Sequence, residues 1–284
     1  MAAKILDGNA IARRLRQGIA ERVKERAARG LPPPGLAVLL VGDDPGSQIY
    51  VRLKRKDCRE VGFAEDAWHL PSSITEAELI DLIQQLNADA TFNGILVQLP
   101  LPEHIDPVRV TESVAAGKDV DGVHPYNMGR LVLREPAIRP CTSKAVMWLL
   151  EHTGVPLRGL HATVIGASNH VGRPMGLELL LVGCTVTTVH RFSHHAREDV
   201  AHSDIVVSAT GKAGLVGADW IKPGAVVIDV GIVAQADGKV RGDVRFDEVV
   251  DRAGWITPVP GGVGPMTRVA LLDNTLRAAE LAKS

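Results

Sequence analysis

Hydrophobic positions in the first half of the chain alternate between helical and strand-like spacing. Hydrophobic side chains recur every three or four positions over residues 8–29, which predicts a helix there. A continuous apolar run over residues 36–41 ends in a loop rich in glycine and aspartate, as expected for a buried parallel strand. Further expected elements are a helix over 46–62, a strand over 64–70, a helix over 75–87 capped by Ser73 or Thr75, and a strand over 93–99. Strands and helices in this order indicate a parallel α/β sheet.

A second alternation of strands and helices follows a loop of polar and small residues over 118–122. A helix is predicted over 143–152, and the chain closes with a predicted helix over 266–282. The strands expected between these two helices cover residues 161–165, 185–190, 204–208, 225–230 and 255–257. A chain of 284 residues is long enough for two domains of roughly 100–200 residues each. We therefore predict an α/β protein of two domains.

Composition and charge narrow the class of protein. The chain is 45% hydrophobic and 23% charged, as in ordinary globular proteins that fold in water. A net charge of -1 gives no electrostatic reason to expect nucleic acid as a partner, and no apolar run is long enough to cross a membrane. The first residues lack the apolar stretch of a signal peptide, so we expect a cytoplasmic protein.

Cysteines and histidines show no pattern of a disulfide framework or a metal site. Cys58, Cys141 and Cys184 are too few and too scattered for either a set of disulfides or a zinc cluster. Of the 10 histidines, those between residues 194 and 202 could gather on a short helix, but no known ligand spacing is present. We therefore expect reduced thiols and no bound metal.

The predicted helix over residues 46–62 carries the first candidate chemistry. Tyr50 and Lys54 lie four positions apart, so their side chains share one face of the helix. An aromatic ring beside an amine can stack against a flat substrate while the amine transfers protons. Arg55 and Lys56 are rival bases, but neither shares the face of Tyr50. The alternative interpretation is a solvated lysine on an exposed helix surface.

A glycine-containing turn follows the expected strand over residues 161–165. Gly166-Ala-Ser-Asn-His-Val-Gly172 would place backbone N–H groups at the start of a helix over 175–182, where such groups bind a pyrophosphate. The turn departs from the G-x-G-x-x-G fingerprint, because Ser168 stands where the second glycine would be and Gly172 comes one residue late. Tight glycine turns also occur here in α/β proteins that bind no nucleotide.

The end of the next predicted strand indicates which dinucleotide would bind. A fold that binds NAD carries an acidic residue about 20 residues beyond the glycines. Here Arg191 occupies that place, with Ser193 nearby. An arginine can pair with the 2′-phosphate of NADP, whereas it cannot accept hydrogen bonds from the bare ribose hydroxyls of NAD. NADP is therefore the predicted cofactor. A surface arginine after a strand is the alternative.

Several segments together resemble one family. They are Val41-Gly-Asp-Asp-Pro-Gly-Ser-Gln-Ile-Tyr-Val51, Gly94-Ile-Leu-Val-Gln-Leu-Pro-Leu-Pro102, Lys118-Asp-Val-Asp-Gly122, Arg139-Pro-Cys-Thr142, the turn at Gly166, and Ile256-Thr-Pro-Val-Pro-Gly-Gly-Val-Gly-Pro-Met-Thr267. In one register over nearly the whole chain, they resemble bacterial bifunctional methylenetetrahydrofolate dehydrogenase/cyclohydrolase. The resemblance implies oxidation of 5,10-methylenetetrahydrofolate to 5,10-methenyltetrahydrofolate with NADP, followed by hydrolysis to 10-formyltetrahydrofolate.

The resemblance also implies a domain arrangement. An N-terminal α/β folate-binding and catalytic domain would comprise residues 1–139 and 266–284, so that the C-terminal helix returns to it. A Rossmann-like NADP-binding domain would comprise residues 140–265, and a cleft between the domains would hold folate and NADP. The family further implies a homodimer through the cofactor domain, and a place in one-carbon metabolism and purine biosynthesis.

The resemblance assigns roles to particular residues. Lys54 corresponds to the catalytic lysine, and Tyr50 to the tyrosine that stacks on the aminobenzoyl ring of the folate. Gln98 corresponds to the glutamine that hydrogen-bonds the lysine, and Asp121 to the aspartate that holds the pterin, while Asp119 is expected to brace the turn. The other implied folate-binding positions are Val97, Leu99, Pro260, Gly261 and Gly262. The implied NADP-binding positions are Gly166, Ala167, Ser168, Gly172, Arg191, Ser193 and Ile232.

Three other functions remain open from the sequence. The chain could be a dehydrogenase without cyclohydrolase activity, which sequence alone separates poorly from the bifunctional enzyme. It could be an NADP-dependent dehydrogenase of another small substrate, which would share the cofactor domain without needing Lys54 and Asp121. A binding protein without turnover is the third alternative, and the intact Lys54 argues against it.

Overall fold

The computed structural model describes residues 2–235 and 238–282, and these residues form two compact units. The three-stranded unit, named after its sheet, comprises residues 14–141 and 268–282; the six-stranded unit comprises the described residues of 2–13 and 142–267. The predicted α/β fold of two domains is confirmed. The return of the C-terminal helix α10 (Val263–Leu281) to the unit of the N-terminal half is also confirmed, because residues from 268 onward group with that unit.

The first residues of the chain differ from the predicted domain arrangement. They belong to the six-stranded unit, because β1 (Lys4–Ile5) pairs in parallel with β11 (Trp255–Ile256). A strand of two residues is too short to show a hydrophobic period, so its place is set by hydrogen bonds to a segment far along the chain.

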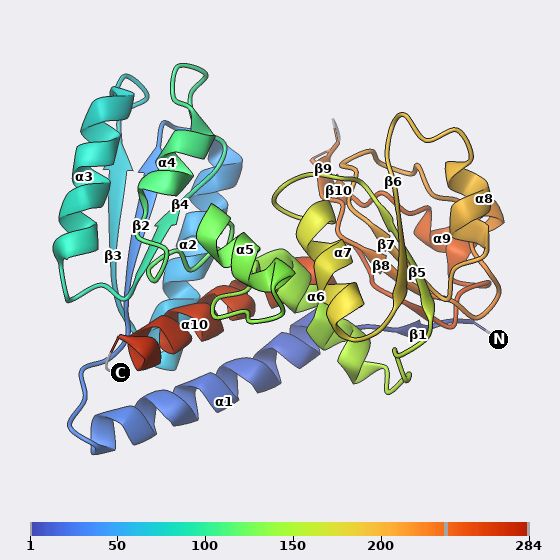
Figure 1. The fold of residues 1–284 in the computed structure, drawn as a ribbon, viewed down its shortest axis with the longest axis horizontal. Helices are drawn as coiled ribbons and strands as arrows, with labels where there is room; N and C mark the ends of the chain where they lie inside the picture. Colours follow the sequence, from blue (N-terminus) through green and yellow to red (C-terminus); the bar gives the residue numbers. More distant parts are fainter. Residues whose placement is uncertain (1, 236–237, 283–284) are drawn as a thin grey trace. The chain divides into compact units, whose positions relative to one another are not determined.

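The three-stranded sheet has β2 (Gly35–Val41) at its centre, with β3 (Ala64–Leu70) and β4 (Gly94–Val97) as parallel neighbours. Every residue of β2 is buried, which explains its continuous apolar sequence. The helices of this part of the chain are α1 (Gly8–Ala28), α2 (Pro45–Val61), α3 (Glu76–Ala88), α4 (Pro107–Ser113) and α5 (Pro125–Val132). Figure 1 shows α3 and α2 on opposite sides of this sheet, and side chains of α3 and α4 share one core cluster with β2.

Local sequence explains where two of these helices begin and end. The Asp44 carboxylate accepts a hydrogen bond from the Ser47 N–H at 2.7 Å and so caps the start of α2. The helix ends at Gly62, whose φ of +84° lies in the left-handed region that glycine adopts without strain. Thr75, one of the two predicted caps, forms a reciprocal capping box with Glu78 at the start of α3.

The six-stranded sheet is parallel throughout, in the order β1-β11-β8-β7-β5-β6. Its remaining strands are β5 (His161–Ile165), β6 (Thr185–Val189), β7 (Ile205–Ser208) and β8 (Val226–Asp229), and a separate antiparallel ribbon pairs β9 (Val233–Ala234) with β10 (Val240–Arg241). The helices are α6 (Cys141–His152), α7 (Gly172–Leu181), α8 (Ala196–Ala201), the 3-10 turn η1 (Ala218–Trp220) and α9 (Phe246–Val249). The strand order changes direction at β5, since β6 and β7 lie on either side of it. Ligands of open α/β sheets bind at the carboxyl ends of strands at such a point.

Candidate active site

A lysine and a glutamine lie together beyond the carboxyl ends of the three-stranded sheet. The Lys54 Nζ on α2 donates a hydrogen bond to Gln98 Oε1 at 2.9 Å. The strand β4 stops at Val97, two residues before the predicted end at 99, so Gln98 follows the strand instead of lying in it. Gln98 Nε2 donates to the carbonyl of Leu99 at 2.7 Å, which turns the amide oxygen toward the lysine. Gln98 therefore orients the amine without adding a charge.

The environment of Lys54 favours the neutral amine. Burial is the largest cause that lowers the pKa of Lys54, because the ammonium loses contact with water. The carboxylate of Asp121 acts in the opposite direction, and the positive charge of Arg268 adds to the lowering. A lysine with a lowered pKa keeps a larger fraction of its amine free to accept a proton near neutral pH.

Tyr50 and Lys54 share a face of α2, as predicted from their spacing, and both side chains are half-buried. The two rival bases, Arg55 and Lys56, lie outside this pair. Arg55 donates a hydrogen bond to Glu65 at 2.6 Å, and Lys56 is exposed. An arginine paired with a carboxylate stays protonated, so Lys54 is the candidate proton acceptor of this helix.

Two aspartates of the loop after β4 have different roles. Asp119 is buried, and its carboxylate accepts hydrogen bonds from the N–H groups of Gly122 and His124 and from Asn127 Nδ2 at 3.1, 2.8 and 2.9 Å. Asp119 thus braces the turn. Asp121 is half-buried, and its carboxylate makes no hydrogen bond within the described residues. Its oxygens are therefore available to a ligand.

An ion pair behind Lys54 was not predicted from the sequence. Arg268 Nε lies 3.3 Å from Asp57 Oδ2, and the Asp57 side chain is 5% exposed. Burial raises the pKa of Asp57, while Arg268 lowers it. Asp57 lies three positions after Lys54, so the two side chains are neighbours on the surface of α2. A charged residue on the buried face of a helix needs a partner, and this feature of the sequence could have indicated the ion pair. Cys58 also lies here, and burial raises the pKa of its thiol to about 12, which keeps it neutral.

The turn after β5 in the six-stranded unit requires both of its glycines. Gly166 has a φ of +118°, and a Cβ there would lie 2.4 Å from the carbonyl oxygen of Ala209. A Cβ on Gly172 would lie 2.0 Å from the carbonyl oxygen of Gly166, so the first residue of α7 packs directly on the turn. The Ser168 hydroxyl accepts the Val171 N–H at 3.2 Å. Close backbone approach at a helix N-terminus fits the phosphates of a dinucleotide.

Arg191 lies just beyond the carboxyl end of β6, the strand next to this turn. Its side chain is exposed and its guanidinium lies 4.7 Å from the centroid of the Phe192 ring. It makes no ion pair with any residue that the structure describes. Ser193 Oγ accepts the His190 N–H at 3.0 Å, which closes the turn that carries Arg191. A cation without a protein carboxylate is available to a 2′-phosphate.

The other predicted ligand positions are divided between the two units. Val97 and Leu99 flank Gln98 in the three-stranded unit, and both are half-buried. The predicted folate loop at 260–262 and Ile232 lie in the six-stranded unit. Ile232 follows β8 and is 48% exposed.

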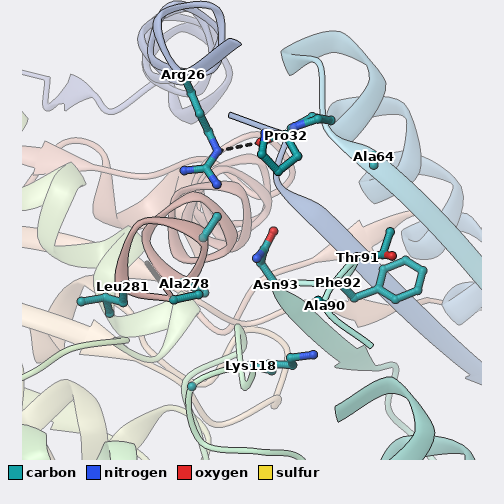
Figure 2. A pocket seen from close by; sticks show the side chains of 14 residues that line it. Arg26, Pro32, Ala64, Ala90, Thr91, Phe92, Asn93, Lys118, Ala278 and Leu281 are labelled. Atoms are coloured by element: carbon teal, nitrogen blue, oxygen red, sulfur yellow. Dashed lines mark hydrogen bonds between the residues drawn. The ribbon is translucent and has the colours of Figure 1, made fainter. Parts of the chain in front are cut away.

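A hollow of about 800 Å³ in the three-stranded unit contains none of the predicted site residues (Figure 2). It lies at the amino ends of the strands, beside Ala64 and Asn93, whereas Lys54 and Gln98 lie beyond the carboxyl ends. Arg26 Nε donates there to the carbonyl of Pro32 at 2.7 Å. This hollow is thus separate from the candidate chemistry.

Residues 2–235 and 238–282 contain neither a candidate metal centre nor a candidate membrane-spanning helix. No group of three or more His, Cys, Asp or Glu side chains there is arranged to hold a metal ion. No described helix is long and apolar enough to cross a membrane.

Comparison with known families gives two matches that together cover most of the chain. Residues 6–121 match the tetrahydrofolate dehydrogenase/cyclohydrolase catalytic domain. Residues 140–283 match the NAD(P)-binding domain of the same family.

Solved structures of enzymes from distant organisms agree with these matches. The bifunctional methylenetetrahydrofolate dehydrogenase/cyclohydrolase of Campylobacter jejuni is 43% identical, with a TM-score of 0.96 over 99% of this chain and 100% of that chain. The enzyme of Trypanosoma brucei, in complex with NADP and an inhibitor, is 40% identical, with a TM-score of 0.95 over 100% and 99%. The enzyme of Thermoplasma acidophilum is 34% identical, with a TM-score of 0.92 over 99% of both chains. The chain therefore belongs to the tetrahydrofolate dehydrogenase/cyclohydrolase family.

Proposed function

We propose that this chain oxidises 5,10-methylenetetrahydrofolate with NADP and then hydrolyses the methenyl product to 10-formyltetrahydrofolate. The observation that carries the proposal is the hydrogen bond from Lys54, an amine with a lowered pKa, to Gln98. A dehydrogenase that only positions two rings has no use for such an amine, whereas hydrolysis requires proton transfers.

In the oxidation, electron density from the folate nitrogens expels a hydride from the bridging methylene, and NADP accepts it. In this step the residues of this chain hold the folate and the nicotinamide in position and transfer no proton. The ring of Tyr50 stacks on the aminobenzoyl group, and the free carboxylate of Asp121 accepts hydrogen bonds from the pterin. Gly166 and Gly172 let the backbone approach the phosphates of the dinucleotide.

In the hydrolysis, water adds to the methenyl carbon and loses a proton, and the bond from that carbon to N5 breaks. Lys54 accepts one proton from the water and returns it to the leaving nitrogen, N5. The remaining hydroxyl proton leaves to solvent as the formyl C=O forms, so the cationic methenyl group becomes a neutral product and one proton is released. Gln98 holds the lysine amine in place during both transfers.

An absorbance assay with 5,10-methylenetetrahydrofolate and NADP tests this function. Formation of the methenyl product followed by its decay, faster than in buffer, is the expected result. Formation without accelerated decay would favour the alternative of a dehydrogenase alone. Absence of both signals in folded protein would contradict the proposal.

The rate of methenyl hydrolysis should rise with pH through an ionisation below that of an ordinary lysine, whose pKa is 10.5. The unprotonated amine is the active form, and burial lowers the pKa of Lys54, so the rise moves to lower pH. The measurement is kcat against pH, corrected for the uncatalysed reaction. Lys56→Gln, a change at an exposed lysine of the same helix, should leave the profile unchanged. A profile that is flat until pH 10 would exclude a base with a lowered pKa.

Arg191→Ala should reduce the preference for NADP over NAD by roughly ten- to a hundredfold. A charge-assisted hydrogen bond contributes about 1.5–3 kcal/mol, and Arg191 makes no ion pair within the described residues that would compete with the 2′-phosphate. The ratio of kcat/KM for the two cofactors measures the effect. Arg197→Ala is the control, because that exposed arginine is already paired with Asp219 at 2.9 Å. An unchanged ratio in the Arg191 variant would mean that another residue recognises the 2′-phosphate.

The same proposal includes a homodimer through the cofactor domain, a cytoplasmic location, and supply of 10-formyltetrahydrofolate to purine biosynthesis. The resemblance of the sequence to bacterial members of the family supports these three points. Light scattering of the purified protein tests the first of them, with a mass of one chain, 30.4 kDa, as the contrary result.

A further inference from the structure

Two buried aspartates lie at the carboxyl edge of the six-stranded sheet, outside every predicted ligand position. Asp229 is the last residue of β8, and Asp243 follows β10; their exposed fractions are 3% and 0%. A buried carboxylate is costly unless hydrogen-bond donors surround it. The donors around these two show which segments the carboxylates hold.

Asp243 binds the end of β7 and the loop that follows it. Its Oδ2 accepts hydrogen bonds from the Ser208 hydroxyl at 2.9 Å and from the Thr210 N–H at 2.6 Å. Its Oδ1 accepts the Lys212 N–H at 2.9 Å. Three donors from one short segment converge on one carboxylate, so Asp243 fixes the course of residues 208–212.

Asp229 holds the backbone of Asp243 and the loop after β8. Its Oδ1 accepts the N–H groups of Gly231 at 2.9 Å and of Asp243 at 3.0 Å, and its Oδ2 accepts that of Val244 at 2.8 Å. Glycine is required beside both carboxylates. A Cβ on Gly231 would lie 2.2 Å from Asp243 Oδ1, and one on Gly242 would lie 2.0 Å from Asp229 Oδ2.

The segment that Asp243 fixes forms one wall of the glycine turn. The carbonyl oxygen of Ala209 lies 2.4 Å from the position that a Cβ would take on Gly166. Ala209 also donates its N–H to the carbonyl of Ile165 at 2.8 Å. Beyond that segment in the strand order, the Gly231 loop after β8 leads directly to Ile232, a predicted dinucleotide position. The two aspartates thus connect both loops that border the predicted dinucleotide position.

We propose that Asp243 is a positioning residue for the dinucleotide: it holds the loop after β7 against the glycine turn, so that the backbone at Gly166 meets the phosphates in a fixed geometry. Asp229 supports it by holding its main chain. The proposal rests on the proposed function, because the dinucleotide is the ligand of that turn. A carboxylate suits this role because its two oxygens can accept all three donors at once.

Asp243→Asn should weaken NADP binding about tenfold or more. An amide has one accepting oxygen, and its NH₂ group would face an N–H donor of the loop. NADP affinity is measured by calorimetry without folate, which gives a readout besides activity. Hydrolysis of added methenyltetrahydrofolate, which consumes no NADP, should stay within about twofold of the wild-type rate, since its proposed base, Lys54, lies in the other unit.

Ser208→Ala is a milder variant, for the case in which Asp243→Asn fails to fold. It removes one donor to Asp243 and keeps the carboxylate, so NADP affinity should fall about fivefold. The matched control is Asp204→Asn. Asp204 accepts the His161 N–H at 3.0 Å at the amino end of the same sheet, so its loss disturbs a loop without touching the dinucleotide edge.

Wild-type NADP affinity in both the Asp243 and Ser208 variants would overturn the proposal. So would an equal loss of affinity in Asp204→Asn at matched stability, because that would show a general effect of destabilisation. Failure of the wild-type protein itself to bind NADP would instead overturn the proposed function. The three outcomes are distinct.

Discussion

Replacing Lys54 by methionine is expected to lower the rate of methenyltetrahydrofolate hydrolysis by about 10²–10⁴-fold, the usual contribution of a positioned acid or base. Methionine keeps most of the apolar stem of lysine and removes only the amine that hydrogen-bonds Gln98. The fold should therefore persist. The measurement is the decay of methenyl absorbance, corrected for the reaction in buffer, together with thermal unfolding of the variant.

Lys56→Met is the matched control for this change. It makes the same substitution two residues later on α2, at an exposed position. Hydrolysis by this control should equal that of the wild type. Wild-type hydrolysis by a folded Lys54 variant would remove Lys54 from the proposed mechanism, whereas a loss in both variants would indicate a general effect on the helix.

Asp121→Asn is expected to weaken folate binding by roughly ten- to a hundredfold, which corresponds to a charge-assisted contact of about 1.5–3 kcal/mol. A carboxylate can accept from a ring nitrogen and the neighbouring exocyclic amine of a pterin together, and an amide cannot. The Asp121 carboxylate has no hydrogen bond to the described protein residues, so little stability should be lost. Fluorescence titration with a folate measures the affinity, and NADP affinity should stay nearly unchanged.

Asp119→Asn separates the two aspartates of the loop. Asp119 is buried and accepts three hydrogen bonds from its own turn, so its change should lower the free energy of unfolding. When the two variants have similar stability, Asp121→Asn should reduce folate affinity more than Asp119→Asn does. If the Asp121 variant keeps its folate affinity, the carboxylate has been assigned to the wrong ligand.

Local patterns in the sequence predicted most of the regular elements. The apolar run of β2 and the helical period of α1 each result from burial of one segment against its neighbours, and that requirement is visible in the residues themselves. The short helices α4 and α5 were not predicted, because helices of seven and eight residues show too little of a period. β1 was missed for the same reason.

The sequence by itself determined the face of α2 that carries Tyr50 and Lys54, because helical spacing fixes which side chains point together. Combined with the family resemblance, it also identified Gln98, Asp121 and Arg191 as candidates. These residues could be named without coordinates, since each lies in a short motif whose register is set locally.

Only the tertiary structure decided which charged groups surround these candidates. Arg268 and Asp57 lie more than two hundred positions apart, and they form an ion pair because α10 returns to the three-stranded unit. Asp243 reaches residues 208–212 because the β9–β10 ribbon brings it to the end of β7. Hydrogen bonds and burial of this kind depend on which segments the fold brings together, and no local pattern records that.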